Sequence, residues 1–187
     1  FNNYLQVVIK QIKQIESLVN EFSDFARMPK PVFQSSNLVE IINTNINLLK
    51  EFDKSIKINF NYAKSDCVIN CDYEQISRVF FNLIKNSIES IQEKFTKKVD
   101  FSKFIDIEMF NKNAYISIGI IDNGIGISDK NIKNLTKPYY STKSKGSGLG
   151  LSIVTKIIND HNGSIKFKSI KNGAKITLIL PKNKNVS

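Results

Sequence analysis

The sequence is short of cysteine and histidine, lacks tryptophan and contains no long apolar run. Its two cysteines, Cys67 and Cys71, cannot build the disulfide framework of a small secreted domain. Its one histidine, His161, leaves too few ligands for a structural zinc site. The best apolar run, residues 115–121, has the length of a strand, whereas a membrane-spanning helix needs roughly 20 residues. These shortages exclude a disulfide-stapled scaffold and a zinc finger, and we expect no membrane span among these residues.

The spacing of the two cysteines also argues against a bridge between them. Cys67 and Cys71 are four positions apart in a segment with strand character, so about 13 Å separates them at roughly 3.3 Å per residue. A disulfide requires Cα atoms within about 7 Å of each other. We therefore expect two small buried thiols in a reducing cytoplasm, and we expect this part of the protein to be cytoplasmic.

Positive charge is in excess, with 27 lysines and arginines against 17 acidic residues, a net charge of +10 and a pI near 9.5. These cations are spread along the chain among many Asn and Ile residues, without a stripe in which cations alternate with aromatic residues. The pattern does not favour binding to nucleic acid. The net charge instead helps to attract an anionic ligand or an acidic partner. The remaining composition, 41% hydrophobic and 24% charged, is that of a globular domain.

The first segment has the clearest periodicity, with apolar residues in alternating steps of three and four, the pattern of a heptad seam. The residues of this seam are Leu5, Val8, Ile12, Ile15, Val19, Phe22 and Ala26. A helix with one narrow apolar stripe is expected to pair with another helix. Pro29 and Pro31 then end the helix, because each proline disfavours helical angles in the residue before it. The chain opens on Phe1 rather than Met, so we expect it to be a piece of a longer protein.

After the prolines, helices and strands follow in a mixed order. We expect helices at 38–49, 73–91 and 149–159. Asn37 is expected to cap the first of them, and the capping-box pair Asp72 and Gln75 to open the second. We expect strands at 56–62, 68–69, 105–110, 115–121, 164–169 and 174–180. The alternation of a Rossmann sheet is absent. The order therefore predicts the α/β (α+β) class, a two-layer α/β sandwich with helices on one face of a mixed, mostly antiparallel sheet.

Two asparagines, Asn82 and Asn86, stand four residues apart within the helix expected at 73–91. Positions four apart on a helix lie on one face, about 6 Å from each other. Two carboxamide oxygens placed in this way can hold a hydrated Mg²⁺ and leave its charge free for phosphate oxygens. By itself, however, the pair is more typical of two solvated side chains in an asparagine-rich chain.

A glycine-rich turn, Asp122-Asn123-Gly124-Ile125-Gly126, directly follows one of the expected strands. Glycines let the backbone turn sharply and approach a ligand closely. An aspartate at the strand end can accept a hydrogen bond from an exocyclic amine. Adenine carries that donor where guanine has a carbonyl, so a buried carboxylate would favour adenine by roughly 2–4 kcal/mol. The pattern also occurs in ordinary turns, and it does not decide the function alone.

A second glycine-rich loop, residues 145–151 (Lys-Gly-Ser-Gly-Leu-Gly-Leu), opens the last helix. The backbone N–H groups of such a loop and the positive end of the helix dipole form a cradle for phosphates. The loop matches neither a Walker motif nor a dinucleotide fingerprint. Between the two glycine loops, residues 137–143 (Lys-Pro-Tyr-Tyr-Ser-Thr-Lys) supply hydroxyls and cations on a segment suited to close over a nucleotide.

Taken in this order, the segments resemble the ATP-binding domain of sensor histidine kinases, within the superfamily that includes gyrase, heat-shock chaperone and MutL ATPases. Residues 82–87 resemble the N box of that family, 122–126 its first glycine box, 138–140 a variant of its F box and 146–151 its second glycine box. The resemblance covers about Ser35 to Pro181 and implies a Bergerat-type ATPase fold.

The leading helix extends the resemblance. Residues 21–31 are similar to the end of the second helix of the dimerisation and phosphoacceptor hairpin in kinases of the nitrogen-regulation NtrY/NtrB type. The implied domains are 1–28 for this helix, 29–36 for a linker, 37–182 for the ATP-binding catalytic domain and 183–187 for a tail.

The resemblance implies ATP and Mg²⁺ as cofactors and assigns a role to each matching residue. Asp122 would bind the adenine amino group, with Gly124 and Gly126 shaping the pocket. Asn86 would be a ligand of Mg²⁺, and Asn82 would support it directly or through water. The residues expected to contact the phosphates are Thr142, Lys143, Gly146, Gly148, Leu149 and Gly150.

Several residues depart from the family pattern or have no assigned role. Ser87 stands where alanine is usual, which we expect to be a small change, and Tyr139-Tyr140 replaces the commoner phenylalanine. His161 lies after the last helix and is expected to be structural. The role of Arg78 is left open between phosphate contact and packing.

The family also requires residues that this chain lacks, and their absence limits the activity that we expect. Its phosphoacceptor histidine, with a carboxylate beside it, lies on the first helix of the hairpin, so we expect this chain to bind ATP without autophosphorylation and to contain no catalytic residue. In the parent protein, the phosphoryl group would pass from ATP to a histidine and then to an aspartate of a response regulator. We expect the parent to be a homodimer through the hairpin, with any attachment to an inner membrane made by segments outside this chain.

Two other functions remain open at this point. One is a serine kinase or anti-sigma type ATPase of the same superfamily, which needs no histidine. The other is a non-catalytic module that binds nucleotide or serves dimerisation. A topoisomerase or chaperone ATPase is disfavoured because those enzymes use a glutamate base where Asn82 stands.

Overall fold

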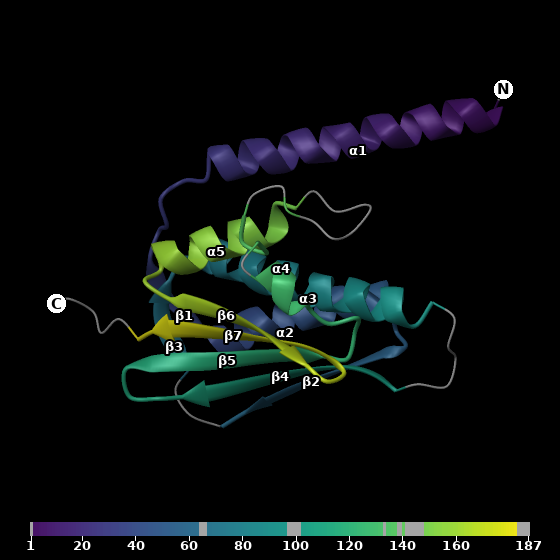
Figure 1. Ribbon diagram of the computed structural model, residues 1–187. Coiled ribbons are helices and arrows are strands. Elements are labelled where there is room, and N and C mark those ends of the chain that lie inside the picture. The colour runs from purple at the N-terminus through teal and green to yellow at the C-terminus, as the bar shows by residue number, and fades with distance from the viewer. Residues whose placement is uncertain are drawn as a thin grey trace.

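The computed structural model describes residues 2–63, 67–96, 102–132, 134–137, 140 and 148–182. Figure 1 shows a long helix, α1 (Asn2–Ala26), lying above a two-layer body in which helices cover one face of a sheet. The other helices are α2 (Leu38–Leu49), the 3-10 helix η1 (Lys50–Phe52), α3 (Tyr73–Lys94), α4 (Asp129–Ile132) and α5 (Gly150–Asp160). The strands are β1 (Gln34–Asn37), β2 (Ile56–Tyr62), β3 (Val68–Cys71), β4 (Lys103–Asn111), β5 (Tyr115–Asp122), β6 (Ser164–Ile170) and β7 (Gly173–Pro181).

The main sheet has five strands in the order β2-β4-β5-β7-β6. β2 and β4 are parallel, and the other three pairs are antiparallel. This arrangement, with the helices on one face, confirms the predicted two-layer sandwich and its mixed, mostly antiparallel sheet (Figure 1). Because β5 lies in the middle of the sheet, its last residue, Asp122, is held between β4 and β7.

A second, small sheet pairs β1 with β3, and β1 was not predicted. Its sequence, Gln-Ser-Ser-Asn, has no apolar alternation, so periodicity gives no signal for a strand. Pairing with β3 places it instead, with Ser35 opposite Asn70. Asn37 then ends the strand and caps α2 as predicted, because its side chain accepts a hydrogen bond from the backbone N–H of Val39.

The core lies between the helices and the sheet and is built mainly from isoleucine and leucine. On β4 and β5, every second residue points to the helices and is buried, as the two-residue period of a strand requires. α3 supplies the other side of the core with the fully buried residues Ile76, Val79, Phe80, Leu83, Ile84 and Ile91. Fully burying such a side chain contributes roughly 1.5–3 kcal/mol. This packing fixes α3 against the sheet, so the polar residues on its flanks are held in set positions.

Both cysteines are free and buried, as predicted. Burial raises the pKa of the Cys71 thiol to about 11, so this residue stays protonated and unreactive at neutral pH.

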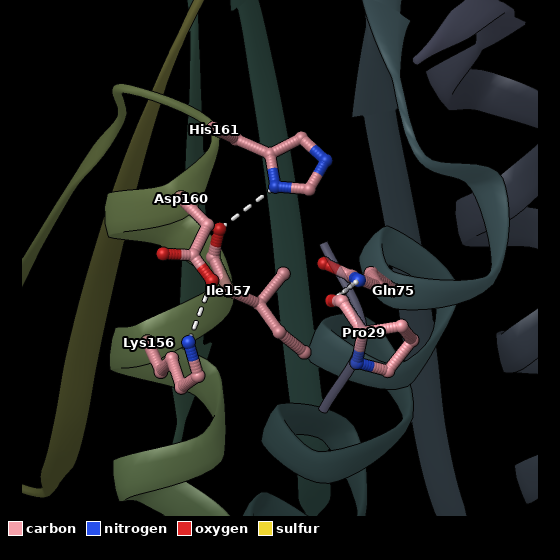
Figure 2. A network of polar contacts seen from close by, with 6 residues as sticks. All are labelled: Pro29, Gln75, Lys156, Ile157, Asp160 and His161. Carbon is pink, nitrogen blue, oxygen red and sulfur yellow. Dashed lines mark hydrogen bonds and ion pairs between the residues drawn. The ribbon is translucent and has the colours of Figure 1, made fainter. Parts of the chain in front are cut away.

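The predicted linker is hydrogen-bonded to the first turn of α3. The side-chain amide of Gln75 donates to the carbonyl of Pro29 at 3.1 Å, as Figure 2 shows. The backbone N–H of Val32 donates to one carboxylate oxygen of Asp72 at 2.8 Å, and the other oxygen accepts from the N–H of Gln75 at 3.0 Å. Asp72 therefore caps α3 and holds the linker at the same time.

His161 completes this attachment from the other side. Its Nδ1 lies 2.8 Å from the carbonyl of Ile157, and its Nε2 lies 3.0 Å from the backbone N–H of Asp72 (Figure 2 shows the first of these bonds). The pairing assigns Nδ1 as donor and Nε2 as acceptor, which is a neutral imidazole. The ring centroid of Phe33 lies 5.1 Å from that of His161, which is only 2% exposed. The geometry agrees with the predicted structural role of His161.

α1 (Asn2–Ala26) forms within the segment where the first helix was predicted, and its apolar seam faces solvent. Six large apolar residues of the seam are each about half exposed: Leu5, Val8, Ile12, Ile15, Val19 and Phe22. Among the described helices, none combines the length and the apolar character that crossing a bilayer requires.

Candidate functional site

The predicted site begins at Asp122, the last residue of β5, whose carboxylate is buried at 4% exposure. One carboxylate oxygen accepts the backbone N–H of Gly124 at 2.9 Å, and the other accepts the hydroxyl of Ser87 at 3.1 Å. Burial raises the pKa of this carboxyl, whereas the hydrogen bonds from Gly124, Ser87 and the backbone of Ala174 and the charge of Lys94 lower it. The result is an aspartate that is desolvated, oriented and surrounded by donors.

The turn after Asp122 is pressed against α3. A Cβ on Gly124 would lie 2.1 Å from the Oγ of Ser90 and 2.7 Å from its backbone carbonyl carbon, so only glycine fits there. The N–H of Ile125 donates to Ser90 as well, at 3.1 Å to its Oγ and 3.3 Å to its carbonyl oxygen. Gly126, the second predicted glycine, has a φ of +80°. The turn is therefore held against α3 at Ser90.

Lys94 and Asn123 hold the same turn from its outer side, and neither was predicted. The ammonium of Lys94 donates to the carbonyl of Asn123 at 2.8 Å and to that of Asn172 at 3.4 Å. The side chain of Asn123 accepts from the N–H of Phe104 at 3.0 Å and donates to the carbonyl of Ser102 at 2.7 Å. These contacts tie the turn to β4 and to the β6–β7 connection. These contacts join residues that are far apart in sequence, so no local sequence pattern predicts them.

The β6–β7 connection also approaches the site directly through Gly173. A Cβ at this position would lie 1.8 Å from the carbonyl oxygen of Asp122, so any side chain would displace the end of β5. Gly173 adopts a φ of +152° and is the partner of Ile170 across the hairpin. It belongs to the surroundings of the site, although the predicted set of residues does not include it.

Asn82 and the start of α5 lie next to each other, as their predicted shared role requires. The side-chain N–H₂ group of Asn82 donates to the carbonyl of Arg78 at 2.9 Å. The Oδ1 of Asn82 therefore points away from the Arg78 carbonyl. A Cβ on Gly150 would lie 3.4 Å from this Oδ1. Asn86 lies one turn further along α3 and is half-buried. The four-residue spacing places both asparagines on one face of α3, and Asn82 is the one that lies beside the start of α5.

The described end of the second glycine loop forms the first turn of α5. Gly148 has a φ of +72°, Leu149 is fully buried at the N-cap position, and Gly150 begins the helix. The apolar side chain of Leu149 offers no oxygen to the N–H groups of the first turn, a setting that suits an anionic ligand. Thr142, Lys143 and Gly146 lie outside the described residues, as do Pro138, Tyr139 and Ser141 of the predicted lid.

The donor chemistry of the described residues fits Mg²⁺ better than zinc. In the part of the chain that the structure describes, no three His, Cys, Asp or Glu residues gather into a metal-binding group. Two amide oxygens on one helix face are the hard, neutral ligands that a partly hydrated Mg²⁺ accepts. Asn82 and Asn86 therefore remain the residues that would hold this ion.

Arg78 lines a separate cavity of about 680 Å³ between the end of α1 and the N-terminal half of α3. Met28, Leu48 and Phe81 give it apolar walls, and Gln75 contributes a buried side-chain oxygen without a hydrogen-bond partner among the described residues. Arg78 thus faces the space between α1 and the sandwich.

α3 connects all the described parts of the site. Its residues from Asn82 to Ser90 span about 12 Å along the helix axis at 1.5 Å per residue. One end of this span faces the glycine start of α5, and the other end faces the buried carboxylate and its turn. The arrangement can bind the amine of a base at one end and phosphates at the other.

Comparison with known proteins gives a consistent family. Residues 71–184 match the family described as histidine kinase-, DNA gyrase B- and HSP90-like ATPases. An NtrY-like sensor histidine kinase of Rickettsia conorii is 36% identical over 163 residues, which are 87% of this chain and 26% of that protein. The chain spans about a quarter of the length of the first curated relatives that it matches.

Solved structures agree with the fold. The catalytic domain of the histidine kinase ThkA is 27% identical with a TM-score of 0.71, covering 81% of this chain and 96% of that one. ThkA in complex with the response regulator protein TrrA is 23% identical with a TM-score of 0.77, covering 96% of this chain and 51% of that one. These likenesses confirm the predicted Bergerat-type fold.

Proposed function

Because this chain belongs to the histidine kinase-, DNA gyrase B- and HSP90-like ATPase family and carries the ATP-binding kinase domain of a sensor histidine kinase, we propose that it binds Mg-ATP for phosphoryl transfer to a histidine of the longer protein. The observation that supports this most is the carboxylate of Asp122, which is buried and held by donors at the end of a central strand. Burying a carboxylate is costly, and a hydrogen bond from a base amine would offset part of that cost.

Recognition of the base is the role of Asp122 in this proposal. Its carboxylate accepts a hydrogen bond from the exocyclic amine of adenine, and Gly124 and Gly126 let the backbone approach the ring. Guanine presents a carbonyl at the same position, so two acceptors would face each other in a desolvated pocket. That mismatch disfavours GTP by roughly 2–4 kcal/mol.

The phosphates lie toward the other end of α3 in this proposal. Asn86 and Asn82 would hold Mg²⁺, which when bound neutralises phosphate charge, and the N–H groups of Gly148, Leu149 and Gly150 bind phosphate oxygens. Thr142, Lys143 and Gly146 complete the set. Phosphoryl transfer of this kind depends mainly on positioning and on charge stabilisation, which are the tasks that these groups perform.

The histidine that accepts the phosphoryl group belongs to the longer protein, which also binds the response regulator in this proposal. A histidine on the first helix of the hairpin receives the phosphoryl group and then passes it to an aspartate of a response regulator. The complex of ThkA with TrrA is a relative's example of such a partner, and its fold matches 96% of this chain. In the parent, the seam of α1 pairs within a helical hairpin that forms a homodimer, and segments outside this chain make any attachment to the inner membrane.

The test is a calorimetric titration with Mg-ATP and Mg-GTP of the wild type and of Asp122→Asn. We expect the wild type to bind ATP at least about thirtyfold more tightly than GTP, and Asp122→Asn to lose about tenfold or more in ATP affinity. Asp106→Asn is the matched control, because Asp106 lies on β4 and bonds only Asn59 among the contacts that the structure gives.

Two results would contradict the proposal. Absence of heat with both nucleotides would favour the non-catalytic module, and equal affinity for ATP and GTP would remove the role of Asp122. Phosphorylation of a small protein on serine would favour the serine-kinase alternative.

A further inference from the structure

Ser87 lies in the middle of α3, and its side chain points to the site from the core side of the helix. It is 2% exposed, and its hydroxyl donates to Asp122 at 3.1 Å. We propose that Ser87 is a positioning residue for nucleotide recognition, which orients the Asp122 carboxylate so that it can accept a hydrogen bond from the adenine amine. This inference rests on the proposed function and deepens it.

The first argument is the number of acceptor positions on the carboxylate. An ionised carboxylate has about four lone-pair positions. The N–H of Gly124 uses one at 2.9 Å, and the hydroxyl of Ser87 uses one on the other oxygen at 3.1 Å. These two bonds leave acceptor positions for the single N–H of an exocyclic amine. Because the two protein donors come from the turn and from α3, the plane of the carboxylate is set before the ligand arrives.

The second argument is the chemistry of position 87 itself. A serine inside a helix commonly turns its hydroxyl back to the carbonyl one turn earlier. Here the hydroxyl reaches across to β5 instead. An alanine would fill nearly the same space, favour the helix and avoid burying a polar group. Packing therefore gives no reason for a hydroxyl at this position, whereas orienting Asp122 does.

The third argument is the charge of Asp122 in its buried setting. Burial raises its pKa, and the donors that oppose this effect are Gly124, Ser87 and Ala174, together with the charge of Lys94. Gly124 belongs to the turn, Ala174 to β7, and Ser87 and Lys94 to α3. Lys94 is the charged side chain that acts on Asp122 among the described residues. Within the described part of the chain, Ser87 is thus the one side-chain hydroxyl that opposes the rise in the pKa of Asp122 and so favours the ionised form, which can accept two donors on each oxygen.

The experiment compares ATP with inosine triphosphate, which carries a carbonyl in place of the amine. Affinities of the wild type, Ser87→Ala and Ser87→Cys are measured by calorimetry between pH 5 and pH 8. We expect Ser87→Ala to weaken ATP binding about tenfold and to leave inosine triphosphate unchanged, since the lost bond acts on the amine acceptor. Loss of the donor raises the pKa of Asp122, so ATP binding by Ser87→Ala should fall off at a higher pH than in the wild type. Ser87→Cys keeps the shape with a weaker donor and should lie in between.

Ser36→Ala is the control, because Ser36 is also buried, at 7% exposure, and its hydroxyl bonds to Gln34 in β1. It should match the wild type in nucleotide preference and in pH profile. Thermal melting of each variant verifies that it is folded. If Ser87→Ala keeps both the preference for ATP and the pH profile, Ser87 only packs and the inference is wrong. If the wild type itself binds no ATP, the proposed function fails, whatever Ser87→Ala does.

Discussion

At the end of β5, the fit of the site depends on contacts of individual atoms. Asp122 is surrounded by donors, and Gly124 lies so close to α3 that even one carbon would collide with Ser90. Sequence motifs identified Asp122 and Gly124 because their spacing along the chain carries the signal. Ser90 and Lys94 have no such signal, since each meets the turn only after α3 has packed beside β5. Serine in place of the usual alanine at position 87 was expected to be a small change, but the structure gives Ser87 a hydrogen bond to Asp122.

Gly124→Ala tests this close approach. Its Cβ would lie 2.7 Å from a backbone atom of Ser90, so the turn must move away from α3. We expect the free energy of unfolding to fall by about 1–3 kcal/mol, the usual cost of overpacking, and ATP affinity to fall with it. Urea unfolding and calorimetry measure the two effects.

Gly119→Ala is the matched control, because Gly119 lies in β5, the strand that precedes the turn. A Cβ at Gly119 would lie 3.6 Å from the nearest atom, a carbon of the Lys175 side chain, which is ordinary contact. This variant should be as stable as the wild type or more stable, by about 0.4–1 kcal/mol. Equal stability of Gly124→Ala and Gly119→Ala would show that the turn has room.

Among the elements, α3 has the largest part in the site, and its ends have different tasks. Its middle and C-terminal half hold the carboxylate turn, and its first turn holds the linker through Asp72 and Gln75. The N-cap at Asp72 was predicted from sequence, because an N-cap is a local pattern, and the structure confirms it. The predicted capping box is not completed, because the side-chain amide of Gln75 donates to Pro29 and the backbone N–H of Asp72 donates to His161. The linker contacts were not predicted, because Pro29 and Val32 lie 46 and 40 positions away from their partners.

Two substitutions of Asp72 separate its tasks. Asparagine is an equally good N-cap but presents an N–H₂ group where the second oxygen was, so Asp72→Asn should keep the cap and lose the bond from Val32. Asp72→Ala should lose both and cost about 1–2 kcal/mol of unfolding free energy. Hydrogen exchange of the Val32 amide should accelerate in both variants. If the amide stays protected in Asp72→Asn, Asp72 does not hold the linker.

For the whole molecule, composition and periodicity predicted most of the architecture. The two-layer class and the mixed sheet follow from patterns within each segment, and the structure agrees with them. The bounds of the three helices predicted after the prolines agree to within three residues, whereas α4 and η1 were not predicted. The strand order β2-β4-β5-β7-β6 and the small β1–β3 sheet depend on contacts between distant segments. The roles of Thr142, Lys143 and Gly146 stay predictions.

The whole chain should bind ATP without phosphorylating itself. His161, the one histidine, is buried and hydrogen-bonded at both ring nitrogens, so it cannot approach a γ-phosphoryl group without disrupting the end of α5. Incubation with ATP labelled at the γ-phosphoryl group should leave no acid-labile label on the protein. Asp122→Asn serves as the background sample. Label that appears on the wild type and is absent from Asp122→Asn would show that this chain contains its own acceptor.

The hydrogen bonds on Pro29 and Val32 also limit how the ATP-binding body can travel. They leave Arg27 and Met28 as the short stretch between the end of α1 and the first point of attachment. Two residues span at most roughly 7 Å of extended chain, so the ATP-binding body can pivot about this stretch but cannot move far from the end of α1. In the proposed parent protein, this short reach limits which positions along the hairpin the ATP-binding body can serve.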